Sequence, residues 1–94
     1  MKVEVKFFTS LREITGKKTE EIQIQHTITV EKLLTLLSEK YGKNFREYVY
    51  AKNGKVQGFL SFLINGKNIN AIEGFDTKLK QGDTVAILPP VGGG

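Results

Sequence analysis

One segment in the middle of the chain has the spacing of an amphipathic helix. Its apolar residues recur at intervals of three and four, at Val30, Leu33, Leu34, Leu37 and Tyr41. Thr29 can cap the first turn through its side-chain oxygen, and Gly42 interrupts the pattern. The spacing therefore predicts a helix of about three turns after Thr29. Because this helix has a single apolar face, the chain must supply another element that covers it.

Four other segments have the composition of β-strands, with apolar and polar residues alternating or with a dense apolar run. They are residues 2–8, 20–26, 59–65 and 84–88. In the first of them, Val3, Val5 and Phe7 share one face. Strands combined with one main helix indicate an α+β fold, in which a mixed sheet packs on the helix with one face. At 94 residues, without repeats or a linker, the chain is expected to form one domain.

Shorter elements connect these segments. Residues 9–16 favour a short helical turn that a glycine ends. The Asn65-Gly66 pair is typical of a type I′ turn, since both residue types tolerate positive φ, and it predicts a short return strand at 67–70. Residues 43–58 surround another Asn-Gly pair, and we interpret them as a loop or irregular hairpin.

The charge and the residue types exclude several classes of function. The net charge is +4, but the lysines are scattered, so we expect no nucleic-acid partner. The absence of cysteine removes disulfides, cysteine-ligated metal sites and thiol nucleophiles. No apolar run approaches the ~20 residues that span a bilayer, so we expect no membrane association and a cytoplasmic location. His26 is the only histidine, and we interpret it as an ordinary residue, with no metal site and no bound cofactor.

The end of the sequence is the run Pro89-Pro90-Val91-Gly92-Gly93-Gly94. Prolines cannot continue a sheet ladder and favour an extended chain. Six extended residues reach ~20 Å, and glycines, which lack a Cβ, can enter a narrow cleft. The composition indicates an arm that presents a terminal carboxylate. A frayed terminus or a truncated glycine linker is the alternative interpretation.

Two apolar residues fall out of phase with the predicted core. Phe8 lies on the opposite face from Phe7, and Leu88 on the opposite face from Ile87. Each stands at the end of its strand, and exposed apolar residues that cluster often mark a partner surface. The alternative is that residues 43–58 cover both side chains.

Four stretches carry a family resemblance: the opening VEVKFFTSLREITG, the helix after Thr29, the strand and turn LINGKNI, and the ending QGDTVAILPPVGGG. They are similar to the MoaD/ThiS family of ubiquitin-like sulfur carriers, and most of all to the small subunit of molybdopterin synthase. The resemblance implies a β-grasp domain at residues 1–88 and a flexible tail at 89–94. In the β-grasp the first and last strands are parallel neighbours, which implies that Phe8 and Leu88 lie together beside the tail.

The resemblance also implies a function. An adenylating enzyme of the ubiquitin-activating type would use ATP to activate the Gly94 carboxylate, and sulfur would then replace one oxygen. The thiocarboxylate would donate its sulfur in molybdopterin biosynthesis, within the large subunit of molybdopterin synthase. That subunit would hold the catalytic residues, so this chain is expected to be a carrier and not an enzyme. Gly93 and Gly94 are the implied reactive tip. The residues implied for partner binding are Phe8, Leu88, Pro89, Pro90, Val91, Gly92, Arg12 and Glu13.

Three other uses of the same chain stay open. The activated Gly94 could be joined to lysines of other proteins, as in an archaeal ubiquitin-like modifier. It could carry sulfur for thiazole or thiolated nucleosides, or the fold could be a binding module that does not need its last two glycines. Two features depart from the family pattern: residues 43–58 are longer than in compact members, and Asn68 stands where an apolar residue is common. Both departures leave the identity of the partner open.

Overall fold

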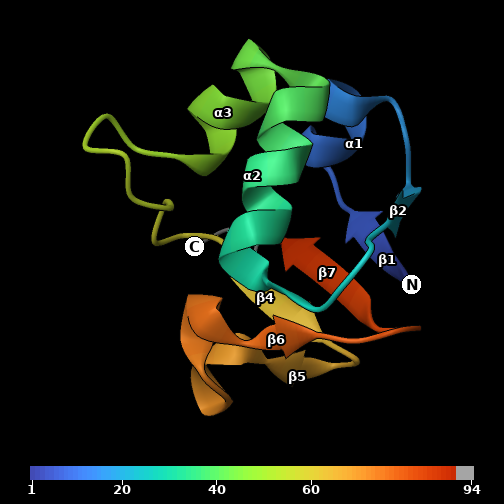
Figure 1. Ribbon diagram of the computed structural model, residues 1–94. Helices are drawn as coiled ribbons and strands as arrows, with labels where there is room; N and C mark the ends of the chain where they lie inside the picture. Colours follow the sequence, from blue (N-terminus) through green and yellow to red (C-terminus); the bar gives the residue numbers. More distant parts are fainter. Residues whose placement is uncertain (91–94) are drawn as a thin grey trace.

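The computed structural model describes residues 1–90 and contains a long helix packed on a sheet (Figure 1). The elements follow in the order β1 (Lys2–Phe7), α1 (Ser10–Thr15), β2 (Thr19–Gln23), β3 (Ile28–Thr29), α2 (Val30–Tyr41), α3 (Lys43–Val49), β4 (Ser61–Ile64), β5 (Lys67–Asn68), the 3₁₀ turns η1 (Ile69–Ala71) and η2 (Gly74–Asp76), β6 (Lys78–Leu79) and β7 (Thr84–Leu88). Within residues 1–90, no helix has both the length and the apolar character needed to cross a membrane.

The main sheet has five strands in the order β2-β1-β7-β4-β5. The neighbours β1 and β7 run parallel, and the other neighbouring strands run antiparallel. A mixed sheet with one main helix on one face is the ubiquitin-like β-grasp, which confirms the fold class predicted from the sequence. The short strands β3 and β6 pair with each other in a second, two-stranded sheet.

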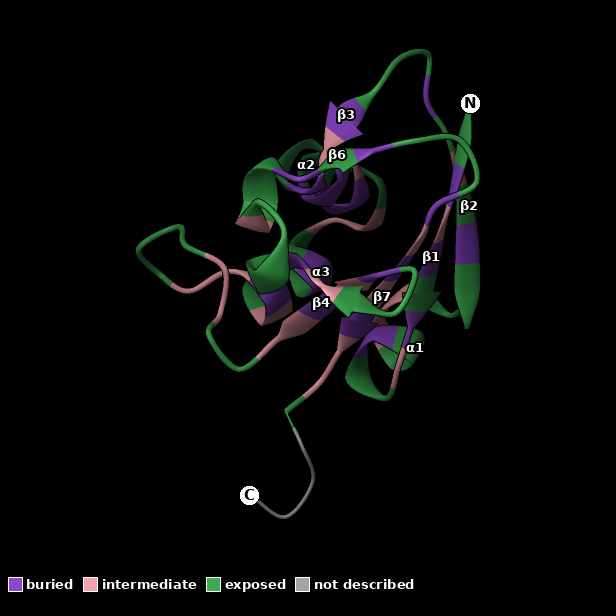
Figure 2. Cartoon of the chain, turned by 90° about the horizontal axis from the view of Figure 1, so that it is seen from below, coloured by how far each residue is buried: buried purple, intermediate pink, exposed green. Residues whose placement is uncertain are grey.

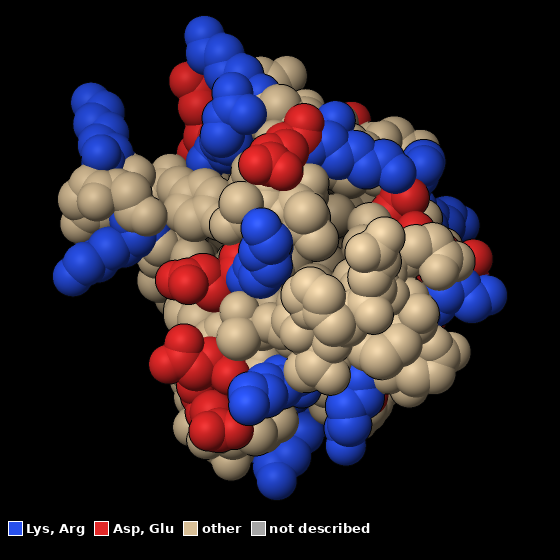
Figure 3. Space-filling view, in the orientation of Figure 1, with Lys and Arg blue, Asp and Glu red and all other residues tan. Residues whose placement is uncertain are grey.

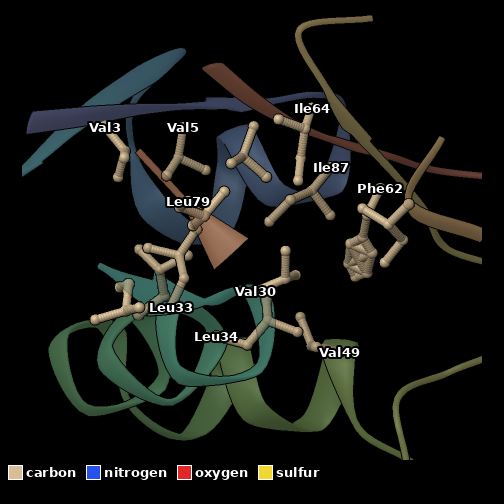
Figure 4. Close-up of a cluster of buried hydrophobic side chains, with 14 of the residues drawn as sticks. Val3, Val5, Val30, Leu33, Leu34, Val49, Phe62, Ile64, Leu79 and Ile87 are labelled. Carbon is tan, nitrogen blue, oxygen red and sulfur yellow. The ribbon is translucent and has the colours of Figure 1, made fainter. Parts of the chain in front are cut away.

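The hydrophobic core lies between the main sheet and α2. Figure 4 shows Val30, Leu33 and Leu34 of α2 on one side and Val5 and Ile87 of the sheet on the other. All five side chains are at most 1% exposed. Burial contributes about 1.5–3 kcal/mol for a side chain of this kind, so packing rather than local propensity holds α2 in place.

The limits of α2 agree with the prediction. The Thr29 hydroxyl accepts a hydrogen bond from the backbone N–H of Lys32 at 3.1 Å. At the other end, Gly42 has φ of 83° and its N–H donates to the Ser38 carbonyl at 2.9 Å. A residue with a Cβ would be strained at this φ, and the glycine therefore ends the helix.

The interpretation of residues 43–58 as a loop or irregular hairpin is wrong for its first half. Lys43–Val49 form α3, which buries Phe45 and Val49 completely. The two buried residues are four apart, but a pattern of only two apolar positions does not distinguish a helix from a loop. The second half is irregular as expected, with one isolated antiparallel bridge between Tyr50 and Val56.

The return strand predicted at 67–70 is too long. It ends at Asn68, whose side-chain oxygen accepts a hydrogen bond from the Asn70 backbone N–H at 2.8 Å and so starts η1. The turn before it agrees with the prediction, since φ is 51° at Asn65 and 87° at Gly66. The strands β3 and β6 were not predicted, because two residues are too few to show a period of two.

A buried carboxylate connects β2 to the end of α2. The Glu20 side chain is 8% exposed and accepts hydrogen bonds from Lys17 at 2.6 Å, from Lys40 at 2.7 Å and from the Tyr41 hydroxyl. These hydrogen bonds, Lys17 first, lower the pKa of Glu20 to about 2. Burial, and then the bond to Glu20, raise the pKa of Tyr41. These hydrogen bonds link the edge strand β2 to the C-terminal end of α2.

The surface charges are mixed. On the face shown in Figure 3, Lys and Arg side chains are spread over the surface with Asp and Glu between them. This distribution agrees with the scattered lysines of the sequence.

Candidate functional site

The strand register brings the two out-of-phase apolar residues to the same end of the sheet. In the parallel pair, Val5 lies opposite Val85 and Phe7 opposite Ile87. The next residues along the two strands are Phe8 and Leu88. Both side chains are half-buried, and neither belongs to the core on the α2 side. Figure 2 shows the alternation of buried and exposed residues along β1 that produces this phase.

A strained turn fixes the position of Phe8. Thr9 has φ of 44° and ψ of −112°, which is the first central position of a type II′ turn and is usually occupied by glycine. The Leu11 N–H donates to the Phe8 carbonyl at 3.0 Å and closes the turn. A β-branched residue in this region is an outlier. This turn could not be predicted from the sequence, because nothing about a threonine indicates positive φ.

Arg12 lies against Phe8. Its Nε donates to the Phe7 carbonyl at 3.0 Å, and its guanidinium is 5.4 Å from the centre of the Phe8 ring. A cation over an aromatic ring is attracted to it and shields that ring face from water. Glu13 follows on α1 with an exposed side chain, and its backbone N–H donates to the Thr9 carbonyl at 3.2 Å. Of the predicted polar pair, Arg12 therefore contacts the apolar surface directly.

A polar clip holds the start of β7. The Asp83 carboxylate is buried and accepts hydrogen bonds from Asn65 Nδ2 at 2.9 Å and from the Lys80 backbone N–H at 2.7 Å. The Asn65 side-chain oxygen accepts in turn from the Thr84 N–H at 2.9 Å. The clip joins the turn after β4 to the turn before β7. It explains the Gly-Asp part of the ending, and spacing alone did not predict it because its partners are 18 residues apart.

The tail leaves the sheet at the opposite end of β7. Leu88, the last strand residue, lies opposite Ser61 of β4. Pro89 is half-buried and Pro90 is exposed. The predicted arm and tip residues Val91, Gly92, Gly93 and Gly94 lie outside the described residues.

The described residues beside the base of the tail include the half-buried pair Phe8 and Leu88, with Arg12 against Phe8. Among residues 1–90, no cluster of three or more His, Cys, Asp or Glu could hold a metal ion. The two groups with displaced pKa values, Glu20 and Tyr41, are bonded to each other between β2 and α2.

Comparison with known proteins assigns the family. A model of the ThiS family matches residues 5–94. The chain belongs to the ThiS family. Proteins of this family are small ubiquitin-like carriers without a catalytic centre of their own, and adenylating enzymes activate them.

Two curated relatives have different names. This ThiS-family chain is 39% identical over 67 residues to a putative sulfur carrier protein of Archaeoglobus fulgidus, covering 71% of this chain and 75% of the relative. It is 31% identical over 94 residues to small archaeal modifier protein 3 of Haloferax volcanii, and the match covers both chains completely.

Two solved structures that resemble this chain likewise have different names, one a modifier and the other a putative molybdopterin converting factor subunit. SAMP1 from Haloferax volcanii superposes with a TM-score of 0.85 at 26% identity and full coverage of both chains. A putative molybdopterin converting factor subunit 1 from Pyrococcus furiosus gives a TM-score of 0.76 at 28% identity, with 96% of this ThiS-family chain and 98% of that chain covered. The specific likeness to a molybdopterin synthase subunit, expected from the sequence, is therefore matched or exceeded by the likeness to the modifiers.

Proposed function

We propose that this chain is a ubiquitin-like protein modifier that is joined through Gly94 to lysines of other proteins. The match to small archaeal modifier protein 3, which runs from end to end of both chains, carries this proposal. The TM-score of 0.85 with SAMP1 supports it. The proposal replaces molybdopterin synthesis as the main function, because the modifiers are at least as similar in sequence and in structure.

The chemistry needs only the tail of this chain. The Gly94 carboxylate attacks the α-phosphate of ATP on an adenylating enzyme, which gives the acyl adenylate and releases pyrophosphate. A lysine ε-amine then attacks the acyl carbon, AMP leaves with the bonding electrons, and the amine loses a proton as the isopeptide forms. A carboxylate alone is a poor acyl donor, and adenylation supplies the leaving group.

The surface at Phe8 and Leu88 would bind the adenylating enzyme. Both residues stand at the end of the sheet from which the tail leaves, and both keep part of their apolar area exposed. An enzyme that acts on the tail can therefore contact them at the same time. Burying apolar area on association contributes binding energy without any charged group.

Sulfur transfer is the second candidate. The 39% identity to a putative sulfur carrier protein favours it. A sulfide-level nucleophile would displace AMP from the same acyl adenylate and leave a thiocarboxylate at Gly94. Donation of this sulfur in molybdopterin biosynthesis, with the large synthase subunit as partner, is one form of this candidate, supported by the Pyrococcus furiosus structure.

The test uses N-terminally tagged protein recovered from its native cells under denaturing conditions. Mass spectrometry of the C-terminal peptide distinguishes the candidates. Gly94 in isopeptide linkage to lysines of other proteins supports the modifier, and a free chain with one carboxyl oxygen replaced by sulfur supports the carrier. A variant lacking the last two glycines is the control, since it should lose both products. Unmodified carboxylate in every peptide would contradict both proposals.

A further inference from the structure

The length of the tail limits how far an activating enzyme can stay from the domain. Gly94 is the fourth residue after Pro90. At ~3.3–3.6 Å for each residue, the Gly94 carboxylate lies at most ~14 Å from Pro90. An enzyme that encloses this carboxylate must therefore bring its surface close to the side chains around the base of the tail. This step depends on the proposed activation of Gly94.

One side of that base is the surface at Phe8 and Leu88, and the other side is formed by the chain that enters β4. Leu88 lies opposite Ser61 in an antiparallel pair. The residues after Leu88 and the residues before Ser61 consequently leave the sheet at the same end. Figure 2 shows the chain leaving β7 on the same side of the molecule as the segment that leads into β4.

That segment exposes an aromatic side chain. Phe59 is 42% exposed, and its ring contacts Tyr48 of α3 edge-on, with 5.8 Å between the ring centres. The hydrogen bond from the Leu60 N–H to the Gln57 carbonyl holds a turn around it. Tyr48 is half-buried against the core and gives the Phe59 ring a fixed support. A large aromatic ring held in place in this way is the kind of residue that dominates binding energies at interfaces.

The charges around the tail indicate the chemistry of the partner surface. No charged side chain occurs between Lys55 and Lys67, nor after Asp83. The segment that leads into β4 and the strand that leads into the tail thus carry no charged side chain, whereas Arg12 lies against Phe8 on the other side. A partner surface that matches them is apolar, since a charged group there would lose water without gaining an opposite charge.

We propose that Phe59, supported by Tyr48, is a second binding contact for the adenylating enzyme, and that an apolar rim of its tail-binding cleft packs on this ring. The base of the tail is then held between two apolar walls, Phe8 with Leu88 on one side and Phe59 on the other. Phe59 directly follows residues 43–58, the region that the family resemblance marks as longer than in compact members. Phe59 therefore contributes to the choice of enzyme, and not to the chemistry at Gly94.

The test is ATP–pyrophosphate exchange catalysed by the purified adenylating enzyme from the same genome, with the full chain as the substrate. Phe59→Ala should raise KM for the chain about tenfold and leave kcat nearly unchanged, because the ring contributes to binding before and during the reaction. Phe59→Leu keeps an apolar side chain and should restore most of the affinity. Thermal unfolding of each variant shows whether the fold is retained.

Ile72→Ala is the matched control. Ile72 is 40% exposed, and it lines a hollow with Ile64 and Asn65, at the opposite end of β4 from Ser61. The KM of the adenylating enzyme for the Ile72→Ala variant should equal its KM for the unchanged chain. A wild-type KM for Phe59→Ala, or an equal increase for Ile72→Ala, would overturn the inference while leaving the activation of Gly94 intact. Absence of exchange with the unchanged chain would instead refute the proposed function, and the inference with it.

Discussion

The buried carboxylate of Glu20 makes the stability of the fold depend on acid pH. Hydrogen bonds from Lys17, Lys40 and Tyr41 lower its pKa from 4.5 to about 2. At about 1.4 kcal/mol for each pH unit, this difference corresponds to about 3 kcal/mol of stability at neutral pH. Lys17 and Lys40 are about half exposed, so solvent screening reduces the contribution to about 1–3 kcal/mol.

The direction of the pH dependence follows from the lowered pKa. The unfolded chain protonates Glu20 near pH 4.5, and the folded chain does so only near pH 2. The stabilisation is therefore complete above about pH 5 and disappears as the pH falls toward 2. A loss of this size is large beside the ~5–15 kcal/mol that holds a typical domain folded.

Glu20→Gln should remove this pH-dependent stabilisation. The amide cannot carry the charge that the two lysines bind, so the free energy of unfolding at pH 7 should fall by about 1–3 kcal/mol. Urea denaturation at pH 7, 5 and 3 measures this, and the difference between wild type and variant should shrink toward pH 3. Glu21→Gln is the control, since its carboxylate is 68% exposed, lies 3.8 Å from Lys2 and should change stability by less than about 0.5 kcal/mol. Equal pH profiles for Glu20→Gln and wild type would refute the reasoning.

Four further substitutions test the site and its supports. Phe8→Asp or Leu88→Asp should weaken binding of the adenylating enzyme in a pull-down with little change in melting temperature, and a large stability loss would show that these residues belong to the core. Asp83→Ala should lower the free energy of unfolding by about 1–3 kcal/mol in urea, because Asn65 Nδ2 loses its acceptor, and an unchanged midpoint would contradict the clip. Thr9→Gly should raise the free energy of unfolding by about 1 kcal/mol through relief of strain at φ 44°, whereas destabilisation in the same assay would show that the turn is unstrained.

The parts of the fold that depend on local pattern could be predicted from the sequence. The apolar spacing after Thr29 gave α2, and the cap and the glycine at its ends are both in place. The alternation in the first and last strands gave their buried faces, and from these the outward position of Phe8 and Leu88. Each of these inferences needs only residues that are neighbours in the chain.

The parts that depend on distant partners could not be predicted. Glu20 looks like any strand glutamate, and its role comes from Lys40 and Tyr41, 20 and 21 residues away. The helix α3 is recognisable only once Phe45 and Val49 are seen to share the core with α1 and α2. The contact of the exposed Phe59 with Tyr48 depends in turn on α3, which is why the second wall beside the tail was not expected from the sequence.

The position of the tail is a consequence of register. The clip at Asp83 holds one end of β7, and pairing with β1 and β4 on its two sides fixes the rest. A slip of one residue would turn Ile87 outward and Leu88 into the core, because strand side chains alternate between faces. Ile87 is completely buried, so such a slip costs core packing as well as the partner surface. The interactions that stabilise the sheet are therefore the same ones that determine which side chains stand beside the tail.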